Sequence, residues 1–471
     1  MGLSLNHTAN LSLIASRLRA SDSFDIIERH LCVANNDVCF FYIDGFTKDS
    51  DIQRLMQFLL SEKSINDAEE LVLRLPYFEV SIEGYTDNIV LSVLSGQTVM
   101  LSSAFPCKSI VLDTRTYPAR TTSEPDTDRV MQGARDGFVE TLVMNTALIR
   151  RRIRDPRLTM EHYNLGGSSS TDVVMCYMNG VADEKTVRKI REKLTRIKPR
   201  GVCLGYQSLA ECFISRGWLN PFPKIRTTER PDTASAQVLE GSVLIICDTT
   251  PQVMILPTSI FDYLQQTDDY YFPPFTGTYL RIVRTLILIL SVILTPVWYL
   301  CLEYAAILPQ PLQFLVPDNP GALPIILQLL LVEAAIDGLK IASMNTPDML
   351  SNSLSVVGAL ILGDFAVGVG WLSEDVILYM AFVAIANFAQ QNVELGYAFK
   401  YIRVLTLVAV HFLGVWGLLV GGLVFILLVL TNKTVTDEHN YLYPLIPFNA
   451  RAMIRLLFRV KKDDFGDEKG K

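Results

Sequence analysis

The amino-acid sequence changes character sharply near residue 280. Residues 1 to about 280 mix charged, polar and apolar residues and are interrupted by proline and glycine, as in ordinary globular domains. A membrane-spanning helix needs about 20 predominantly apolar residues. Apolar runs that meet or approach this length lie at about 285–302, 323–342, 354–372, 375–391 and 402–431. We therefore expect an α/β cytosolic region followed by an all-α multi-pass membrane domain.

The globular half contains an internal repeat. The segments "DVCFFYIDG" and "DVVMCYMNG", at 37–45 and 172–180, share Asp, Val, Tyr and Gly at one constant spacing, and an amphipathic helix pattern follows each. A second pair, 95–112 and 240–257, shows a glycine, a strand, a turn with proline and a returning strand. The members of this pair are 145 residues apart, whereas those of the first pair are 135 residues apart. An insertion of ten residues between the matched units would produce this difference. The pattern predicts two similar α/β subdomains.

These features divide the chain into six expected parts. They are an N-terminal tail (1–23), subdomain 1 (24–125), a connecting basic helix (126–160), subdomain 2 (161–275), the membrane domain (276–460) and a charged cytosolic tail (461–471).

The connecting helix is predicted over 126–158, where Asp126 or Asp128 can cap its start and Asp155-Pro156 ends it. Four cations gather at its end: Arg150, Arg151, Arg152 and Arg154. Cations at a helix C-terminus interact favourably with the helix dipole, so a solvated, stabilising cluster is one interpretation. Docking of the cluster to lipid headgroups or to an acidic neighbour is the other.

Charge and motifs exclude several function classes. A net charge of −7 does not fit nucleic-acid binding, for which a basic surface is expected. The eight cysteines are scattered without a CxxC pair, which favours reduced, packed thiols in a cytosolic setting. No HExxH sequence, nucleophile elbow or Cys/His cluster occurs along the chain. We predict no enzyme, no cofactor and no metal ligand.

Positive residues near the apolar runs suggest a topology. Arg281 and Arg284 precede the first run, and the loop after it has no Lys or Arg, so the N-terminal region should be cytosolic. Lys400 and Arg403 precede the last run and point to the same side, and basic residues continue after 450. The N-terminus lacks a signal-peptide pattern. Two cytosolic termini require an even number of crossings, so one of the five runs must not cross or the last must double back.

The 323–342 run carries charges inside apolar sequence. Glu333 and Asp337 are four residues apart on one helix face, and Lys340 lies close to that face. Ionisable residues facing lipid are costly, so these should face protein or water. They are either locally paired or, with Asp364 as a further candidate, they line a cation path.

Two glycines in the 402–431 run suggest close helix packing. Gly417 and Gly421 are four residues apart, and this spacing lets another helix approach closely.

Long segments of the chain are recognisable. "RDGFVETLVMNTALIRRRIRDPRL" (135–158), "NPFPKIRTTERPDTASAQVLEGSVLIICDTTPQVMILP" (220–257) and "YPLIPFNARAMIRLLFR" (443–459) resemble the A-subunit family of bacterial spore germinant receptors, the GerA family. "DTRTYPARTTSEPDTDRV" and "LLLVEAAIDGLKIASMNTP" are more similar to a sporulation-stage branch of that family than to nutrient-receptor A subunits. The sequence departs from the family pattern in two loops, at "AQQNVELGY" and "TVTDEHNYL".

The resemblance implies a multi-pass protein of the spore inner membrane with both termini in the cytosol. It also implies a homo-oligomeric, pentameric ring that releases monovalent cations during germination, with other spore membrane proteins, among them germinant receptor subunits, and membrane lipid as partners. A non-conducting scaffold that organises those receptor subunits is the alternative.

Overall fold

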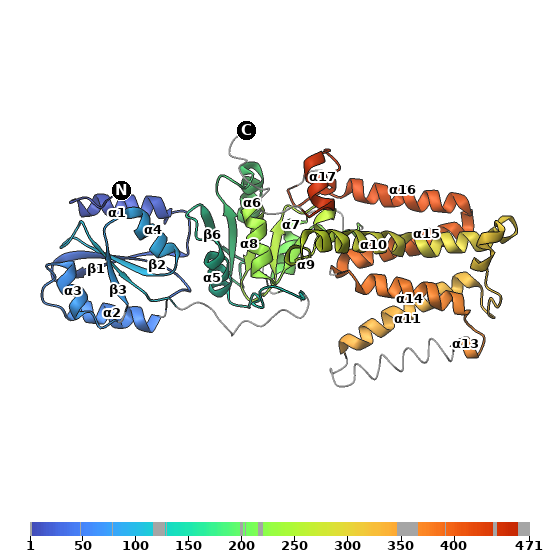
Figure 1. Ribbon diagram of the computed structural model, residues 1–471, viewed down its shortest axis with the longest axis horizontal. Helices are drawn as coiled ribbons and strands as arrows, with labels where there is room; N and C mark the ends of the chain where they lie inside the picture. The colour runs from blue at the N-terminus through green and yellow to red at the C-terminus, as the bar shows by residue number, and fades with distance from the viewer. Residues whose placement is uncertain are drawn as a thin grey trace. The chain divides into compact units, whose positions relative to one another are not determined.

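The computed structural model describes residues 2–47, 49–77, 79–115, 128, 130–197, 201–202, 204–214, 220–345, 366–390, 392–436 and 440–459. The chain divides into two compact units. The first is built mainly from residues 1–216 and 225–258, and the second mainly from 259–434 and 438–471 (Figure 1).

The first half of unit 1, subdomain 1, is one five-stranded sheet with helices on both faces. Its strand order is β1-β2-β4-β5-β3, and every neighbouring pair is antiparallel. In chain order its elements are α1 (His7–Leu18), β1 (Ile26–Val33), β2 (Asn36–Ile43), α2 (Asp49–Ser61), α3 (Ala68–Arg74), β3 (Val80–Glu83), α4 (Thr86–Leu94), β4 (Thr98–Ser102) and β5 (Ser109–Leu112).

The second half of unit 1, subdomain 2, repeats this design. Its strand order is β6-β7-β9-β10-β8, again with antiparallel neighbours. Its elements are α5 (Leu142–Arg152), β6 (Leu158–Leu165), β7 (Thr171–Met178), α6 (Glu184–Arg196), α7 (Tyr206–Phe213), β8 (Arg226–Thr228), α8 (Pro231–Leu239), β9 (Val243–Cys247) and β10 (Val253–Leu256).

The repeat predicted from the sequence is confirmed by the topology and by the strand register. Val38 of β2 lies opposite Ser102 of β4, and Val173 of β7 lies opposite Cys247 of β9. These positions differ by 135 and 145 residues, the two offsets seen in the sequence. The insertion of ten residues therefore falls between the matched strands and leaves their pairing unchanged.

The repeat also includes a helix before each sheet, which the sequence analysis missed. Asn10 of α1 exchanges hydrogen bonds with the backbone N–H and C=O of Ser4, at 2.8 and 2.7 Å. Asn145 of α5 makes the same pair with Val139, at 2.8 and 2.6 Å. The expected tail at 1–23 thus contains the first element of subdomain 1, and the expected connecting helix contains the first element of subdomain 2.

The expected helix over 126–158 is wrong in its start. Helix α5 begins at Leu142, and residues 130–141 form no helix. The backbone N–H of Phe138 donates to Glu229 at 2.8 Å, and that of Val139 donates to the Asn145 side chain. These hydrogen bonds hold the segment in an extended path across subdomain 2.

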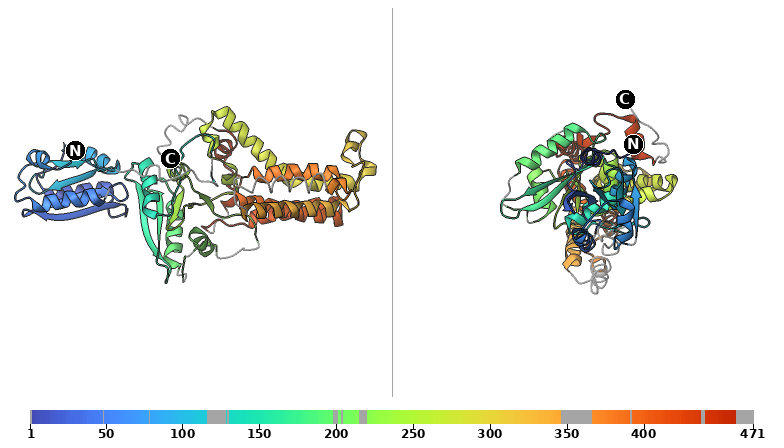
Figure 2. Two further views of the ribbon diagram at one scale, coloured as in Figure 1. Left: turned by 90° about the horizontal axis from the view of Figure 1, so that it is seen from below. Right: turned by 90° about the vertical axis from the view of Figure 1, so that its left-hand side faces the viewer.

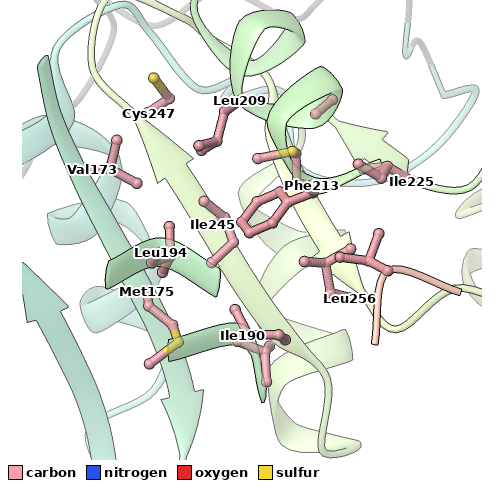
Figure 3. Close-up of a cluster of buried hydrophobic side chains, with 14 of the residues drawn as sticks. Val173, Met175, Ile190, Leu194, Leu209, Phe213, Ile225, Ile245, Cys247 and Leu256 are labelled. Carbon is pink, nitrogen blue, oxygen red and sulfur yellow. The ribbon is translucent and has the colours of Figure 1, made fainter. Parts of the chain in front are cut away.

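Apolar side chains fill both faces of the second sheet. Alternation along a strand directs successive side chains to opposite faces, so both faces of β7 and β9 are buried. On one face, helices α6 and α7 cover a cluster that includes Val173, Met175, Ile190, Leu194 and Phe213 (Figure 3). Helices α5 and α8 cover the other face.

Unit 2 is helical. Helices α10, α14, α15 and α16 lie side by side in Figures 1 and 2, and α11 packs on α14 and α15. Its α-helices are α9 (Asp268–Tyr271), α10 (Pro274–Glu303), α11 (Ile325–Asn345), α13 (Ala366–Gly368), α14 (Glu374–Phe388), α15 (Val393–Leu413), α16 (Val415–Thr431) and α17 (Ala450–Leu457). Four short 3₁₀ helices are also present among the described residues: Ile260–Leu264, Ala305–Ile307, Gln310–Leu315 and Asn440–Leu442.

The apolar run at 402–431 is not one helix. It is divided at Gly414, whose φ of 56° is readily adopted by glycine, and α16 returns along α15. Among the described residues, one helix, α10, is both long and apolar enough to cross a bilayer, whereas the apolar α16 has 17 residues.

Candidate functional site

Two helices of unit 2 bring ionisable side chains into the middle of an apolar bundle. Glu333 and Asp337 are one turn apart on α11, and Lys400 and Arg403 are one turn apart on α15. The flanking residues are mostly Leu, Ile, Val and Ala, which favour helix and supply the packing surface. The four charged residues form what we call the charge cluster.

The charge cluster is connected by short contacts. Arg403 donates from Nη2 to Glu333 Oε1 at 2.6 Å and from Nη1 to the backbone carbonyl of Ser291 in α10 at 3.0 Å. Lys400 Nζ lies 3.2 Å from Glu333 Oε1 and also donates to the Asp337 carboxylate. Two carboxylates and two cations therefore tie together α10, α11 and α15.

Burial makes this pairing necessary. Glu333 is 7% exposed, Lys400 8% and Arg403 1%. A buried charge is tolerated only when a partner and hydrogen bonds compensate for the lost hydration. The cluster has equal numbers of formal charges of each sign, so each buried ion is compensated within the same chain.

The structure shows the locally paired alternative for Glu333, and a role of this carboxylate in a cation path stays a prediction. Its carboxylate faces Arg403 and Lys400 inside the protomer, because pairing is the lowest-cost arrangement for a carboxylate in apolar surroundings. Asp337 keeps a side chain that is 34% exposed. Lys340, expected beside Asp337, instead lies over the Tyr397 ring at 4.8 Å. Asp364 lies outside the described residues.

Lys400 and Arg403 also correct the topology argument. The sequence predicts that they flank the last apolar run, but both lie within α15 and are buried. Similarly, Arg281 and Arg284 lie inside α10, where both contact the buried Asp269, at 3.3 and 3.0 Å. None of the four is a free marker of a membrane surface.

His411 of α15 is a packing residue with a defined partner. The Tyr299 hydroxyl of α10 lies 2.8 Å from His411 Nδ1, within hydrogen-bond distance.

The arginine cluster of α5 divides by position. Arg150 is completely buried and binds Asp25 through Nε and Nη2, at 2.7 and 3.0 Å, and Nη2 also donates to Ser23. Arg152 binds both oxygens of Asp136 at 2.7 Å. Arg151 is partly exposed and Arg154 is exposed.

Arg150 is therefore neither a docking residue nor a solvated cation, because its charge joins α5 to the first strand region of subdomain 1.

Gly417 and Gly421 lie where α16 packs on α15. A Cβ at Gly421 would be 2.2 Å from Thr406 Oγ1, and one at Gly417 would be 2.2 Å from the Ala409 carbonyl oxygen. A side chain at either position would collide with α15, so glycine at both positions allows the two helices to pack closely.

A family model, "Bacillus/Clostridium GerA spore germination protein", matches residues 13–466. Stage V sporulation protein AF of Bacillus subtilis (strain 168) is 35% identical over 462 residues, which cover 97% of this chain and 93% of that protein. Spore germination protein KA of the same organism is 27% identical over 461 residues, 95% of this chain and 84% of that protein. The higher identity with the stage V protein agrees with the expected sporulation-stage branch.

A solved structure also matches the N-terminal region. It is the crystal structure of the N-terminal domain of the A subunit of the Bacillus megaterium spore germinant receptor GerK3. The sequence identity is 26%, the match covers 54% of this chain and 96% of that chain, and the TM-score is 0.41. The family model extends over almost all of the sequence, and the chain is a member of the GerA family of spore germination proteins.

Proposed function

We propose that unit 2 is a multi-pass domain of the spore inner membrane. Its helices turn polar groups inward and apolar groups outward, the pattern expected of helices in lipid. On α10 the exposed apolar residues Ile282, Leu286, Ile289 and Ile293 form one stripe, whereas Ser291 and Thr295 are buried. Helix α16 has exposed apolar residues of its own, among them Leu419, Leu423, Ile426 and Leu430.

Helix length supports the same placement. Helices α11 and α15 have 21 residues each. At about 1.5 Å per residue they are about 30 Å long, which is the thickness of a bilayer core. Each carries charged residues that lower its hydropathy, but the charge cluster pairs Glu333 and Asp337 of α11 with Lys400 and Arg403 of α15.

The function proposed for the chain is a subunit of a ring of identical copies that releases monovalent cations during germination. The exposed carboxylate of the charge cluster is the single observation that carries it, because an ionisable residue inside an apolar helical bundle is a candidate functional site and ion pathways are one such function. Asp337 is its one member with substantial exposure, so it is the carboxylate of the cluster that can face a path between copies. Membership in the germination family supplies the biological setting.

One observation favours a non-conducting scaffold as a second candidate. The two carboxylates of the cluster are matched by two cations of the same chain. A cation path lined by a net negative surface would need more acid than the described cluster provides. The scaffold would hold receptor subunits together and carry no ions itself.

The two functions separate in a reconstituted system. Full-length chain in liposomes should pass monovalent cations, and Asp337→Asn should lower that flux several-fold while the protein level and oligomeric mass stay unchanged. Asp318→Asn, an exposed carboxylate in the loop between α10 and α11, is the matched control and should leave the flux unchanged. A chain that is monomeric in detergent and passes no ions in liposomes would contradict the channel and support the scaffold.

A further inference from the structure

Side chains of metal-binding types meet at one end of the first sheet. Glu28 and His30 lie on the edge strand β1, Asp37 and Cys39 lie on β2, and His7 begins α1. His30 is directly opposite Cys39 in the strand register. The sequence predicts no metal ligand, because these residues form no linear motif and only the β1–β2 pairing brings them together.

Three donor atoms have the separations that a small tetrahedral ion requires. His30 Nε2 is 3.1 Å from Glu28 Oε1, and Cys39 Sγ is 3.8 Å from His30 Nε2 and 4.0 Å from Glu28 Oε1. With the usual zinc–ligand bond lengths, tetrahedral N, O and S ligands lie roughly 3.4–3.6 Å apart. Shifts of a few tenths of an ångström would therefore place all three around one ion.

The surrounding groups supply the support that histidine ligands usually have. Asp37 Oδ1 lies 3.3 Å from His30 Nδ1, the second ring nitrogen, which leaves Nε2 directed at the other two donors. The His7 side chain is 9% exposed, and its Nε2 lies 3.3 Å from the other Asp37 oxygen. In the part of the chain that the structure describes, neither of its ring nitrogens makes a hydrogen bond, so a buried imidazole lies beside the ligand set.

The internal repeat provides a comparison within the molecule. The strand register makes His162 the counterpart of His30. His162 Nε2 lies 3.0 Å from Asp172, whereas His30 contacts Asp37 through Nδ1 at 3.3 Å. The counterparts of Glu28 and Cys39 are Met160 and Val174. The His–Asp pair thus belongs to the sheet design of both subdomains, whereas the carboxylate and the thiol are additions of subdomain 1.

We propose that Glu28, His30 and Cys39 bind one Zn²⁺ ion, with Asp37 as a positioning residue. Nitrogen, sulfur and carboxylate oxygen together are the ligand types that zinc accepts, and a water can complete the tetrahedron. The carboxylate and the thiolate balance the charge of the cation. The ion would join the edge strand β1 to β2 beside the start of α1.

Binding requires the thiol to lose its proton to solvent as the Zn–S bond forms. The ligand atoms that meet the cation are then the Cys39 thiolate, the His30 ring nitrogen Nε2 and the Glu28 carboxylate.

The test uses the full-length chain in detergent with Zn²⁺ alone as the probe. The protein is loaded with Zn²⁺ and then dialysed against metal-free buffer to remove unbound zinc. Wild-type protein should retain about one equivalent of zinc per chain. Cys39→Ser and His30→Ala should abolish retention, and Asp37→Asn should weaken affinity about 10- to 100-fold. Cobalt in place of zinc should give a thiolate charge-transfer absorption that Cys39→Ser removes.

Two matched variants control for nonspecific binding and misfolding. His162→Ala changes the equivalent histidine of subdomain 2, and Cys32→Ser removes an exposed thiol of the same strand. Both should retain zinc as the wild type does, and the conservative Glu28→Gln should weaken zinc binding with an unchanged circular dichroism spectrum. Wild-type protein without bound zinc, or zinc retained equally by Cys39→Ser, would overturn the proposal.

Discussion

The charge cluster predicts strong energetic coupling between α11 and α15. Glu333 and Arg403 are 2.6 Å apart and almost fully buried, so solvent screens their interaction little. Removing one partner of such a pair usually destabilises a protein by about 3–5 kcal/mol, because an uncompensated charge stays buried. We expect Arg403→Met to lower the free energy of unfolding by that amount, and Glu333→Met to act similarly.

The double variant Glu333→Met with Arg403→Met should recover most of the loss. Lys400 and Asp337 then remain as a neutral pair, and the two methionines fill the volume with apolar atoms. A double-mutant cycle on the full-length chain, with denaturant unfolding in mixed micelles, measures the coupling free energy. We expect at least about 3 kcal/mol, well above the average of about 0.6 kcal/mol for interhelical hydrogen bonds in membranes.

The refuting result is a cycle that is nearly additive. A coupling below about 0.6 kcal/mol would mean that Glu333 does not face Arg403 in the folded protein. The interpretation of the charge cluster as an internal tie would then fail, and Glu333 would again be free to face another copy of the chain.

Three further predictions concern other parts of the fold. Gly421→Ala should destabilise the α15–α16 hairpin by about 1–3 kcal/mol in thermal unfolding, because its Cβ would meet Thr406; Gly422→Ala, which meets nothing within 4 Å, should not destabilise it. Arg150→Met should lower the free energy of unfolding by about 3–5 kcal/mol and increase hydrogen exchange near Asp25, because it leaves the buried Asp25 carboxylate without its cation. The control Arg154→Met, at an exposed position, should change the free energy of unfolding by no more than about 0.5 kcal/mol. Partial burial opposes ionisation of Glu161, but hydrogen bonds from Arg191, Tyr163 and Tyr177 lower its pKa overall. The ionised Glu161 therefore contributes fully to the free energy of unfolding above the ordinary glutamate pKa, and this contribution is lost as pH falls through the lowered pKa. Arg191→Ala should reduce the free energy of unfolding at neutral pH. The same variant should show a smaller loss of stability when the pH is lowered.

The internal repeat could be detected in the sequence at positions where the backbone conformation allows few residue types. Gly45 and Gly180 both have positive φ, so the turn after each second strand keeps its glycine. Helix α1 and its match with α5 escaped detection because many apolar residues can cover the same sheet face. A weak signal was present: Asn10, Leu13 and Ile14 recur as Asn145, Leu148 and Ile149 at the offset of 135 residues. The buried asparagine explains the match, since its amide must satisfy the backbone six residues earlier.

The charge cluster could be predicted only in part, for a different physical reason. Spacing within one helix places Glu333 and Asp337 on a common face, but their partners are more than 60 residues away in sequence. The signal that the sequence analysis missed is complementarity: two acids four residues apart in one apolar helix and two cations three residues apart in another. Acidic and basic residues in apolar helices tend to pair with one another, because an unpaired charge is costly to bury.

The ion pairs of these basic residues limit their use for inferring the topology of the proposed membrane domain. The positive-inside rule counts cations that remain at the membrane surface, whereas Lys400 and Arg403 are held by carboxylates within the bundle and Arg284 by Asp269. Removing them from the count leaves the orientation of α15 unassigned by charge. The break at Gly414 carries more weight, because it turns the longest apolar run into two antiparallel helices. Two helices in that run are the doubling back that the sequence analysis offers as one way to reach an even number of crossings.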